Sequence, residues 1–164
     1  MESHRKNLKS YIIIAAATFL LVFILSQTFM LASVDGISME PTLDNGQQML
    51  VLKCHYHLFD PEYNDLVVID YNASNALSHK YIVKRIIGLP GDQLEFKGNQ
   101  VYRNGKMIDE PYLKEIMIGQ VDKVIDIPQN KIFVLGDNRN ESIDSRHFGY
   151  IDVHTQVVGK VLFH

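Results

Sequence analysis

The sequence predicts a mostly antiparallel β domain that follows a single N-terminal transmembrane helix. Two observations support this prediction: an uncharged apolar run near the N-terminus, and a change after it to short runs rich in β-branched and aromatic residues. With 164 residues, 46% of them apolar and 21% charged, the composition excludes a disordered or collagen-like protein. The length fits one domain, so we expect one catalytic or binding unit.

The segment 11–31 is predicted to cross a membrane as a helix. No Asp, Glu, Lys, Arg or His lies between Lys9 and Asp35. A helix over 11–31, rising roughly 1.5 Å per residue, is about 31 Å long and matches the hydrocarbon core of a bilayer. Basic residues precede the run and acidic residues follow it. We therefore expect residues 1–10 to be cytoplasmic and residues 32–164 to form an extracytoplasmic domain in a single-pass protein of the cell membrane.

Two other interpretations of the apolar run stay open at this point. A cleavable secretory signal peptide also has a basic start and an apolar stretch, but this run is long for one and no Ala-x-Ala pattern follows it. A buried helix of a soluble domain would fit the length and would leave the charge asymmetry unexplained. The membrane anchor accounts for both features.

Seven short runs after the anchor have the composition of β-strands. They are the runs 48–54, 65–71, 80–88, 92–96, 101–108, 131–137 and 156–163. Within 101–108, the dipeptide Asn104-Gly105 supplies the positive φ angles of a type I′ turn and predicts a tight hairpin. Residues 116–130 have mixed composition with turn signals around Pro128, and we expect a loop there.

Charge and cysteine content exclude two classes of site. With a net charge of −3, the protein lacks the excess of positive charge that is typical of a dedicated nucleic-acid-binding protein. Cys54 is the single cysteine, so an intramolecular disulfide and a cysteine-based zinc site are excluded. We expect Cys54 to be a small buried apolar side chain.

The first candidate site residue is Ser38, in the segment GISMEPTL directly after the anchor. Gly36 permits an unusual backbone conformation and Pro41 biases Glu40 away from helix, so the Ser38 hydroxyl should be accessible in a turn. A serine in such a turn can equally serve only to hydrogen-bond its own backbone. The segment also lacks the second glycine of a hydrolase nucleophile elbow.

The second candidate is Lys84, in the run KYIVKRIIGLPGD. Strand alternation places Lys84 on one face with Ile82 and Ile86, and Arg85 is its neighbour in sequence. Desolvation and a nearby positive charge both lower the pKa of an ammonium group, and a neutral lysine is a usable general base. The alternative is an edge-strand lysine that extends its amine to water.

The third candidate is the polar loop GDNRNESIDSRHFG, which follows the strand run at Lys131. Asp144 and Arg146 can form an ion pair there, and the Ser142 hydroxyl can orient a neighbouring group. A polar surface loop without a functional role could have the same composition.

In this order, the segments resemble the signature motifs of bacterial type I signal peptidases. These are membrane-anchored serine endopeptidases that release exported proteins from their signal peptides, and the length and single span are similar to the short form of Gram-positive bacteria. The resemblance implies two antiparallel sheets, as in the autopeptidase domains of SOS-response repressors. It also implies a mechanism with no metal or organic cofactor, preproteins with small residues before the cut as substrates, and the lipid bilayer as a second partner.

The resemblance further implies a role for each candidate residue. Ser38 matches the nucleophile and Lys84 the general base, so the implied reaction is acyl transfer through an acyl-enzyme. Ser142 matches a hydroxyl that orients the base, and Asp144 and Arg146 match a supporting pair.

Other positions match the same motifs with less definite roles. Gly136 and Asp137 open the supporting loop. Gly36 stands where some relatives have a serine that completes the oxyanion hole, so the backbone N–H of Ser38 is the implied oxyanion donor. Met39, the next residue, is grouped with it as a contact to substrate or lipid, with ordinary core packing as the alternative.

Two rival functions also fit the sequence. A serine hydrolase could use His147 or His79 as the base in place of Lys84. A membrane-tethered binding or assembly module would not need the hydroxyl of Ser38 at all. A repressor autopeptidase is disfavoured because a spanning helix stands where a DNA-binding domain would be.

Overall fold

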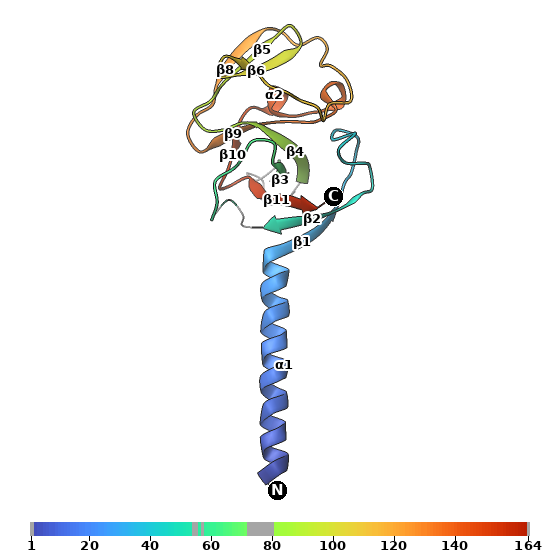
Figure 1. Cartoon of the computed structure of the whole chain (residues 1–164), viewed down its shortest axis with the longest axis vertical. Coiled ribbons are helices and arrows are strands. Elements are labelled where there is room, and N and C mark those ends of the chain that lie inside the picture. The colour runs from blue at the N-terminus through green and yellow to red at the C-terminus, as the bar shows by residue number, and fades with distance from the viewer. Residues whose placement is uncertain (1, 54–55, 57, 72–80, 164) are drawn as a thin grey trace.

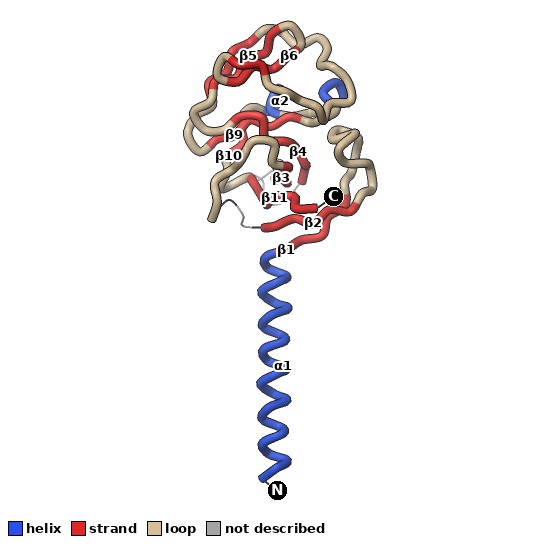
Figure 2. Tube along the Cα trace, viewed as in Figure 1, coloured by secondary structure: helices blue, strands red, loops and turns tan. Residues whose placement is uncertain are grey.

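The computed structural model describes residues 2–53, 56, 58–71 and 81–163. In these residues one long helix precedes a domain of two antiparallel sheets, and Figure 2 shows how strands and loops dominate that domain. The elements are α1 (Glu2–Thr28), β1 (Phe29–Ser33), β2 (Gln48–Lys53), β3 (Leu66–Asp70), β4 (Tyr81–Gly88), β5 (Gln93–Lys97), β6 (Gln100–Arg103), β7 (Lys106–Met107), β8 (Lys123–Asp126), β9 (Lys131–Leu135), the 3₁₀ turn η2 (Arg139–Glu141), α2 (Ser145–Phe148), β10 (Ile151–Asp152) and β11 (Val157–Phe163). The expectations for Cys54 and His79 concern positions outside the described residues.

The N-terminal helix ends three residues earlier than the sequence predicted. α1 stops at Thr28, and residues 29–31 belong to β1, which pairs with β2 so that Phe29 lies opposite Leu52. Pairing in the sheet satisfies the backbone N–H and C=O groups that a longer helix would have used. The apolar stretch Lys9–Thr28 has 20 residues, none of them buried, and at roughly 1.5 Å per residue it reaches about 30 Å, enough to cross a bilayer.

A hydrogen bond joins the end of α1 to the large sheet. The last turn of the helix contains no basic residue of its own, and Lys53 of β2 donates from Nζ to the carbonyl oxygen of Ser26 at 2.7 Å. A cation at this position satisfies a free carbonyl and interacts favourably with the helix dipole. α1 therefore continues into β1 without a linker and is fastened there by a side chain from the neighbouring strand (Figure 1).

The large sheet carries the central strands of the domain. Its strand order is β1-β2-β11-β3-β4-β9-β10, and all of its described pairs are antiparallel. β3 is buried along its whole length and β4 from Val83 to Gly88. Both strands therefore read as continuous apolar runs, interrupted in β4 by Lys84 and Arg85.

The small sheet, in the order β7-β6-β5-β8, lies at the end of the domain farthest from α1 (Figure 1). Its core side chains, such as Phe96, pack with Phe133 of β9. The predicted hairpin is confirmed: Asn104 and Gly105 have φ angles of 53° and 77°, and β6 pairs with β7 around them. Arg103 also donates to the carbonyl of Ile87 at 2.8 Å, which fastens the small sheet to β4.

The loop predicted for residues 116–130 is partly wrong, because β8 lies inside it. β8 pairs with β5, yet Ile125 is its one buried side chain, so the strand carries no alternating apolar pattern. Met117, in the same segment, is buried in the core of the small sheet. Here tertiary pairing and burial override a weak local signal.

Candidate active site

The segment that carries Ser38, residues 34–47, is a loop between β1 and β2 that the core holds at several points. Asn138 fixes it from the opposite side: its backbone N–H donates to the carbonyl of Ser38 at 3.1 Å, and its Nδ2 donates to the carbonyl of Ile37 at 3.2 Å. Met39 and Leu43 are fully buried on the other side. Ser38 is thus held in place by its own backbone, with its side chain half-buried.

Met39 does not occupy the position expected of a lipid or substrate contact. Its exposed fraction is 0%, and it packs in a core cluster with Val51 and Val68. Met39 is therefore a core residue that anchors the Ser38 segment.

Lys84 of β4 meets Ser38 although the two are 46 residues apart in sequence. Its Nζ lies 2.7 Å from Ser38 Oγ and donates to the carbonyl of Val83 at 2.9 Å. Lys84 is only 3% exposed. The structure therefore joins an amine and a hydroxyl at hydrogen-bond distance inside the protein, as nucleophile activation requires.

Burial lowers the pKa of Lys84 from its ordinary value to about 8, and desolvation is the main cause. Asp144 and Asp137 oppose this by attracting the ammonium form, and Arg146 adds to it by repulsion. The sequence assigned the repulsion to Arg85, which is wrong, because the charge of Arg85 is paired with Asp137.

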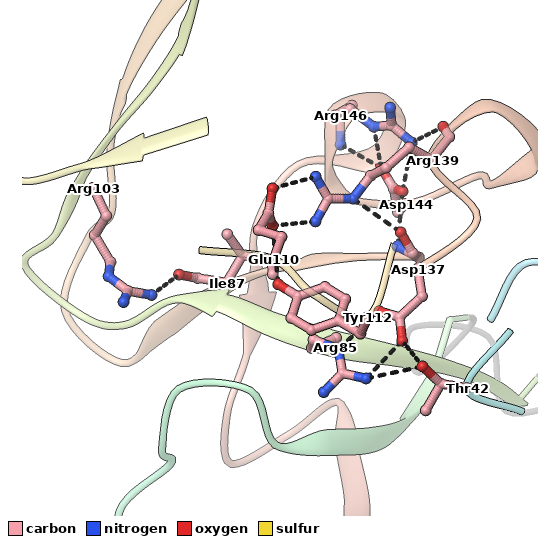
Figure 3. A network of polar contacts seen from close by, with 11 residues as sticks. Thr42, Arg85, Ile87, Arg103, Glu110, Tyr112, Asp137, Arg139, Asp144 and Arg146 are labelled. Carbon is pink, nitrogen blue, oxygen red and sulfur yellow. Dashed lines mark hydrogen bonds and ion pairs between the residues drawn. The ribbon is translucent and has the colours of Figure 1, made fainter. Parts of the chain in front are cut away.

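Asp137 links three segments around this pair of residues (Figure 3). Arg85 donates to its carboxylate from Nε at 2.8 Å and from Nη2 at 2.6 Å, and Thr42 Oγ1 donates to it as well. Arg85 also donates to the carbonyl of Asn64 at 3.0 Å. The ion pair is buried and ties β4 to the Ser38 segment and to the loop after β9.

That loop, residues 136–146, is called the supporting loop below. Asp144 caps the N-terminus of α2 and accepts from Arg146 Nε and Nη2, both at 2.8 Å, and from the N–H of Gly136 at 3.0 Å. The ion pair between Asp144 and Arg146 that the sequence suggested is present. Arg146 Nη2 also donates to the carbonyl of Arg139 at 2.7 Å, so the loop is closed by its own side chains.

Ser142 lies in the supporting loop, 7% exposed, but the implied hydrogen bond to Lys84 is not formed. Its Oγ has no hydrogen-bond partner among the residues that the structure describes. The hydroxyl lies against Gly136, next to the carbonyl of Ser38. A buried hydroxyl without a hydrogen-bond partner costs roughly 1–3 kcal/mol.

A methyl group at Gly136 is expected to disrupt the site. In Gly136→Ala the new Cβ would lie 2.5 Å from the carbonyl oxygen of Ser38 and would overlap Ser142 Oγ. Because the Ser38 carbonyl belongs to the backbone, the Ser38 segment must shift. A shift of about 1 Å away from the productive geometry lowers kcat by about 100-fold. Peptide-cleavage kinetics measure this.

Adding Ser142→Gly to Gly136→Ala serves as a control. The double variant keeps the overlap with the Ser38 carbonyl, so it should be slower than Ser142→Gly alone, which removes the Ser142 hydroxyl without any overlap. Wild-type kcat in Gly136→Ala would contradict this account of the packing.

Two hollows lie near these residues, and they differ in lining. One, of about 310 Å³, is lined by Ser38 and Lys84 together with mostly apolar residues: Met30, Ala32, Val34, Met49, Val68 and Ile82 among them. The other, of about 840 Å³, is polar and is lined by Ser142, Arg146 and the exposed His147. His147 therefore lines a different hollow from the one that contains Ser38. Among the described residues, no group of three or more His, Cys, Asp or Glu side chains could hold a metal ion.

Three residues of the site escaped the sequence prediction: Asn138, Arg139 and Glu110. Asn138 and Arg139 lie inside the recognised motif, so their position was a signal, but the motif does not say which backbone carbonyls they bind. Glu110 pairs with Arg139 from a distant segment, which only the fold reveals.

A family model described as signal peptidase, peptidase S26, matches residues 5–164. The chain belongs to the signal peptidase family. The resemblance inferred from the motifs is thereby confirmed, and the chain is a peptidase of the signal peptidase I type, whose family cleaves signal peptides from preproteins. This membership favours an enzyme over a tethered binding module.

Individual relatives agree with the family assignment. A signal peptidase I of Bacillus caldolyticus is 39% identical over 143 residues, which cover 79% of this chain and 75% of that protein. A signal peptidase IB of Staphylococcus aureus is 37% identical over 177 residues, covering 97% of this chain and 90% of that protein. The crystal structure of a signal peptidase I from Enterococcus faecalis matches with a TM-score of 0.52 at 30% identity, over 63% of this chain and 97% of that chain.

Proposed function

We propose that this signal peptidase is a membrane-anchored serine endopeptidase in which Ser38 is the nucleophile and Lys84 the general base. The observation that carries the proposal is the 2.7 Å distance between Lys84 Nζ and Ser38 Oγ, with the amine buried and its pKa lowered to about 8. A lysine in this state is neutral in a large fraction of molecules near pH 8 and can accept a proton.

The reaction proceeds in two stages. Neutral Lys84 takes the proton of Ser38 Oγ, the oxygen attacks the scissile carbonyl, and the resulting ammonium group then protonates the leaving amine. This leaves an acyl-enzyme on Ser38 and a neutral Lys84. Water attacks the ester after giving a proton to Lys84, and the proton returns to Ser38 as the acid is released. The backbone N–H of Ser38 stabilises the oxyanion in both stages.

Ser142 orients the base in this proposal. Its buried hydroxyl has no hydrogen-bond partner among the described residues, and Lys84 Nζ is hydrogen-bonded to Ser38 Oγ and to the Val83 carbonyl. A hydrogen bond between this hydroxyl and the Lys84 amine, formed when substrate binds, would satisfy the Ser142 hydroxyl. Asp144 and Arg146 hold the loop that carries Ser142.

The substrate is a preprotein whose small residues before the cut fit the 310 Å³ hollow beside Ser38. The apolar side chains that line this hollow, Ala32 and Val34 among them, support an apolar and small occupant. The apolar helix Lys9–Thr28 holds the enzyme in the bilayer that also holds the signal peptide. Tethering both molecules to one surface raises their effective concentration. In the proposed topology the N-terminus is cytoplasmic and the catalytic domain extracytoplasmic.

The test is cleavage of a labelled preprotein by membranes that carry the full-length chain. Wild-type membranes should release the mature protein, with its new N-terminus directly after the small residues, as read by mass spectrometry. Ser38→Ala, which removes only the hydroxyl oxygen, should leave the preprotein intact when the variant is expressed at the level of the wild type. Cleavage by Ser38→Ala at the wild-type rate would remove the assignment.

The rate is expected to rise with pH through the pKa of Lys84. Because the active base is the neutral amine, kcat/KM for a peptide substrate should fall below pH 7 by about tenfold per pH unit and level off above pH 9. The midpoint of this acidic limb should lie near 8, where burial places the pKa of Lys84. A pH series from 6 to 10 measures it. A midpoint near 6.5 would indicate a histidine base instead.

A further inference from the structure

A segment without helix or strand, residues 110–118, contacts three of the segments around the Ser38–Lys84 pair from the side of the small sheet. It follows β7 and precedes β8, and we call it the strap. Met117 anchors it in the core of the small sheet. Its polar side chains reach three different segments: the supporting loop, β4 and the Ser38 segment.

The strongest of these contacts joins Glu110 to Arg139. The carboxylate faces the guanidinium with both oxygens, with one of the two hydrogen bonds at 3.0 Å, and the side chains are 9% and 1% exposed. Arg139 Nε donates to the carbonyl of Gly136 at 3.1 Å, and the carbonyl of Arg139 accepts from Arg146. Arg139 thus connects the two ends of the supporting loop, and Glu110 neutralises it.

Tyr112 extends the contact to β4 (Figure 3). Its ring covers the guanidinium of Arg85 at 4.0 Å, and its hydroxyl donates to Glu110 at 2.9 Å. Burial is the main cause that raises the pKa of Tyr112, so the hydroxyl stays protonated and remains a donor. Glu110 therefore has two fixed donors, Arg139 of the supporting loop and Tyr112 of the strap itself.

The far half of the strap is held by the Ser38 segment and by the supporting loop. Lys114 lies 3.3 Å from Glu40, two residues after Ser38, in a partly exposed ion pair. Asn140 donates to the carbonyl of Ile116 at 3.1 Å and accepts from the N–H of Ile118 at 2.9 Å. These contacts fix the strap along its length.

We infer that Glu110 is a positioning residue for the Ser38–Lys84 pair, which acts by holding Arg139 and with it the supporting loop. The inference rests on the proposed function. Arg139 is buried, and without Glu110 its guanidinium would be an unpaired buried charge. We therefore expect it to pair with another carboxylate. The next carboxylate in the described hydrogen-bond network is that of Asp144, in the same loop, which now accepts hydrogen bonds from Arg146.

The charges with the largest influence on the pKa of Lys84 lie in the supporting loop: Asp144 and Asp137 attract its proton, and Arg146 repels it. Asp35 of the Ser38 segment lines the 310 Å³ hollow that Lys84 also lines. If Asp144 turns to Arg139 in the absence of Glu110, Lys84 loses its main anionic neighbour. Its proton is then held less tightly, and the acidic limb of the rate profile moves to lower pH.

The experiment compares Glu110→Gln with Asp109→Asn in the full-length enzyme in detergent, with a quenched peptide substrate. Glu110→Gln keeps the shape of the side chain and loses its charge. We expect kcat to fall by about tenfold or more, with KM within about twofold of the wild-type value. We also expect the acidic limb of the rate profile to move to lower pH. Asp109→Asn is the matched control, since Asp109 is the exposed neighbouring carboxylate and outside this network. It should match the wild type in kcat, KM and pH profile.

Two further variants separate positioning from a loss of fold. Glu110→Asp restores the charge with a shorter reach and should recover part of kcat and return the acidic limb toward its wild-type midpoint. Tyr112→Phe keeps the ring on Arg85 and removes one donor to Glu110, so it should change kcat less than Glu110→Gln. Thermal unfolding of each variant gives the folded fraction, to which activity is referred.

The inference is overturned if Glu110→Gln matches Asp109→Asn in kcat and in its pH profile, or if its activity falls only in proportion to the folded fraction. If Glu110→Gln does not fold, Glu110→Asp decides: a lowered kcat with a shifted limb supports positioning, and a wild-type profile contradicts it. Ser38→Ala is measured beside them. Activity in Ser38→Ala refutes the proposed function itself, whereas an inactive Ser38→Ala with unchanged Glu110→Gln refutes only the role of the strap.

Discussion

Replacement of Lys84 by methionine is expected to lower the rate of signal-peptide cleavage by about 10⁴-fold or more, because the hydroxyl of Ser38 then lacks the base that we propose for it. Methionine keeps an unbranched side chain of similar size in the buried position and removes the amine that lies 2.7 Å from Ser38 Oγ. Removing a buried, desolvated amine leaves the core packing intact, so the fold should persist. Single-turnover cleavage of a labelled preprotein measures the loss.

The double variant Ser38→Ala/Lys84→Met should be no slower than either single variant, because the two residues act as one unit. Lys97→Met, on the exposed end of β5, is the control for loss of a lysine and should cleave at the wild-type rate. If Lys84→Met kept a tenth or more of the wild-type rate, another residue would have to be the base.

Removal of the Asp137 carboxylate is expected to cause the largest loss of stability, about 3–5 kcal/mol in the free energy of unfolding for Asp137→Ala. The change leaves the Arg85 guanidinium, whose side chain is 10% exposed, without its bidentate partner, and leaves the Thr42 hydroxyl without its acceptor. An uncompensated buried charge costs more than the ion pair itself contributes. Urea unfolding of the full-length protein in detergent, followed by circular dichroism, measures the change.

Two comparisons identify the cause of this loss. Lys131→Met breaks the partly exposed pair between Lys131 and Asp152 and should cost less than about 1 kcal/mol. Arg85→Met/Asp137→Leu removes both buried charges and should be more stable than Asp137→Ala alone. Equal stability of Asp137→Ala and the wild type would show that the buried pair is not needed for folding.

Much of the fold could be predicted because its signals are local. The Asn104-Gly105 dipeptide alone indicates a turn with positive φ angles, and β3 and β4 are buried enough to appear as apolar runs in the sequence. β8 has one buried side chain and no pattern, so only its pairing with β5 defines it. The end of α1 was misplaced for a similar reason: residues 29–31 are apolar in either setting, and β2 decides that they form a strand.

The candidate site divides in the same way. Ser38, Lys84 and Asp144 lie in motifs whose residue types suit their chemistry, so they could be selected from the sequence. The pairing of Glu110 with Arg139 could not, because it depends on how the strap, which joins two strands of the small sheet, lies against the supporting loop. The repulsion on Lys84 was assigned to Arg85 from sequence proximity, whereas the fold neutralises Arg85 and brings Arg146 near.

With α1 spanning the bilayer as proposed, its junction with β1 gives the bilayer a mechanical influence on the enzyme. Helices adjust to thicker or thinner membranes by tilting, commonly by about 20°. With β1 directly after Thr28, and with Lys53 hydrogen-bonded to the helix end, such a tilt is expected to turn the domain together with the helix. The height and angle at which the cleavage centre meets a peptide emerging from the lipid are then set partly by membrane thickness, and lipids that change this thickness should alter the choice of cleavage position.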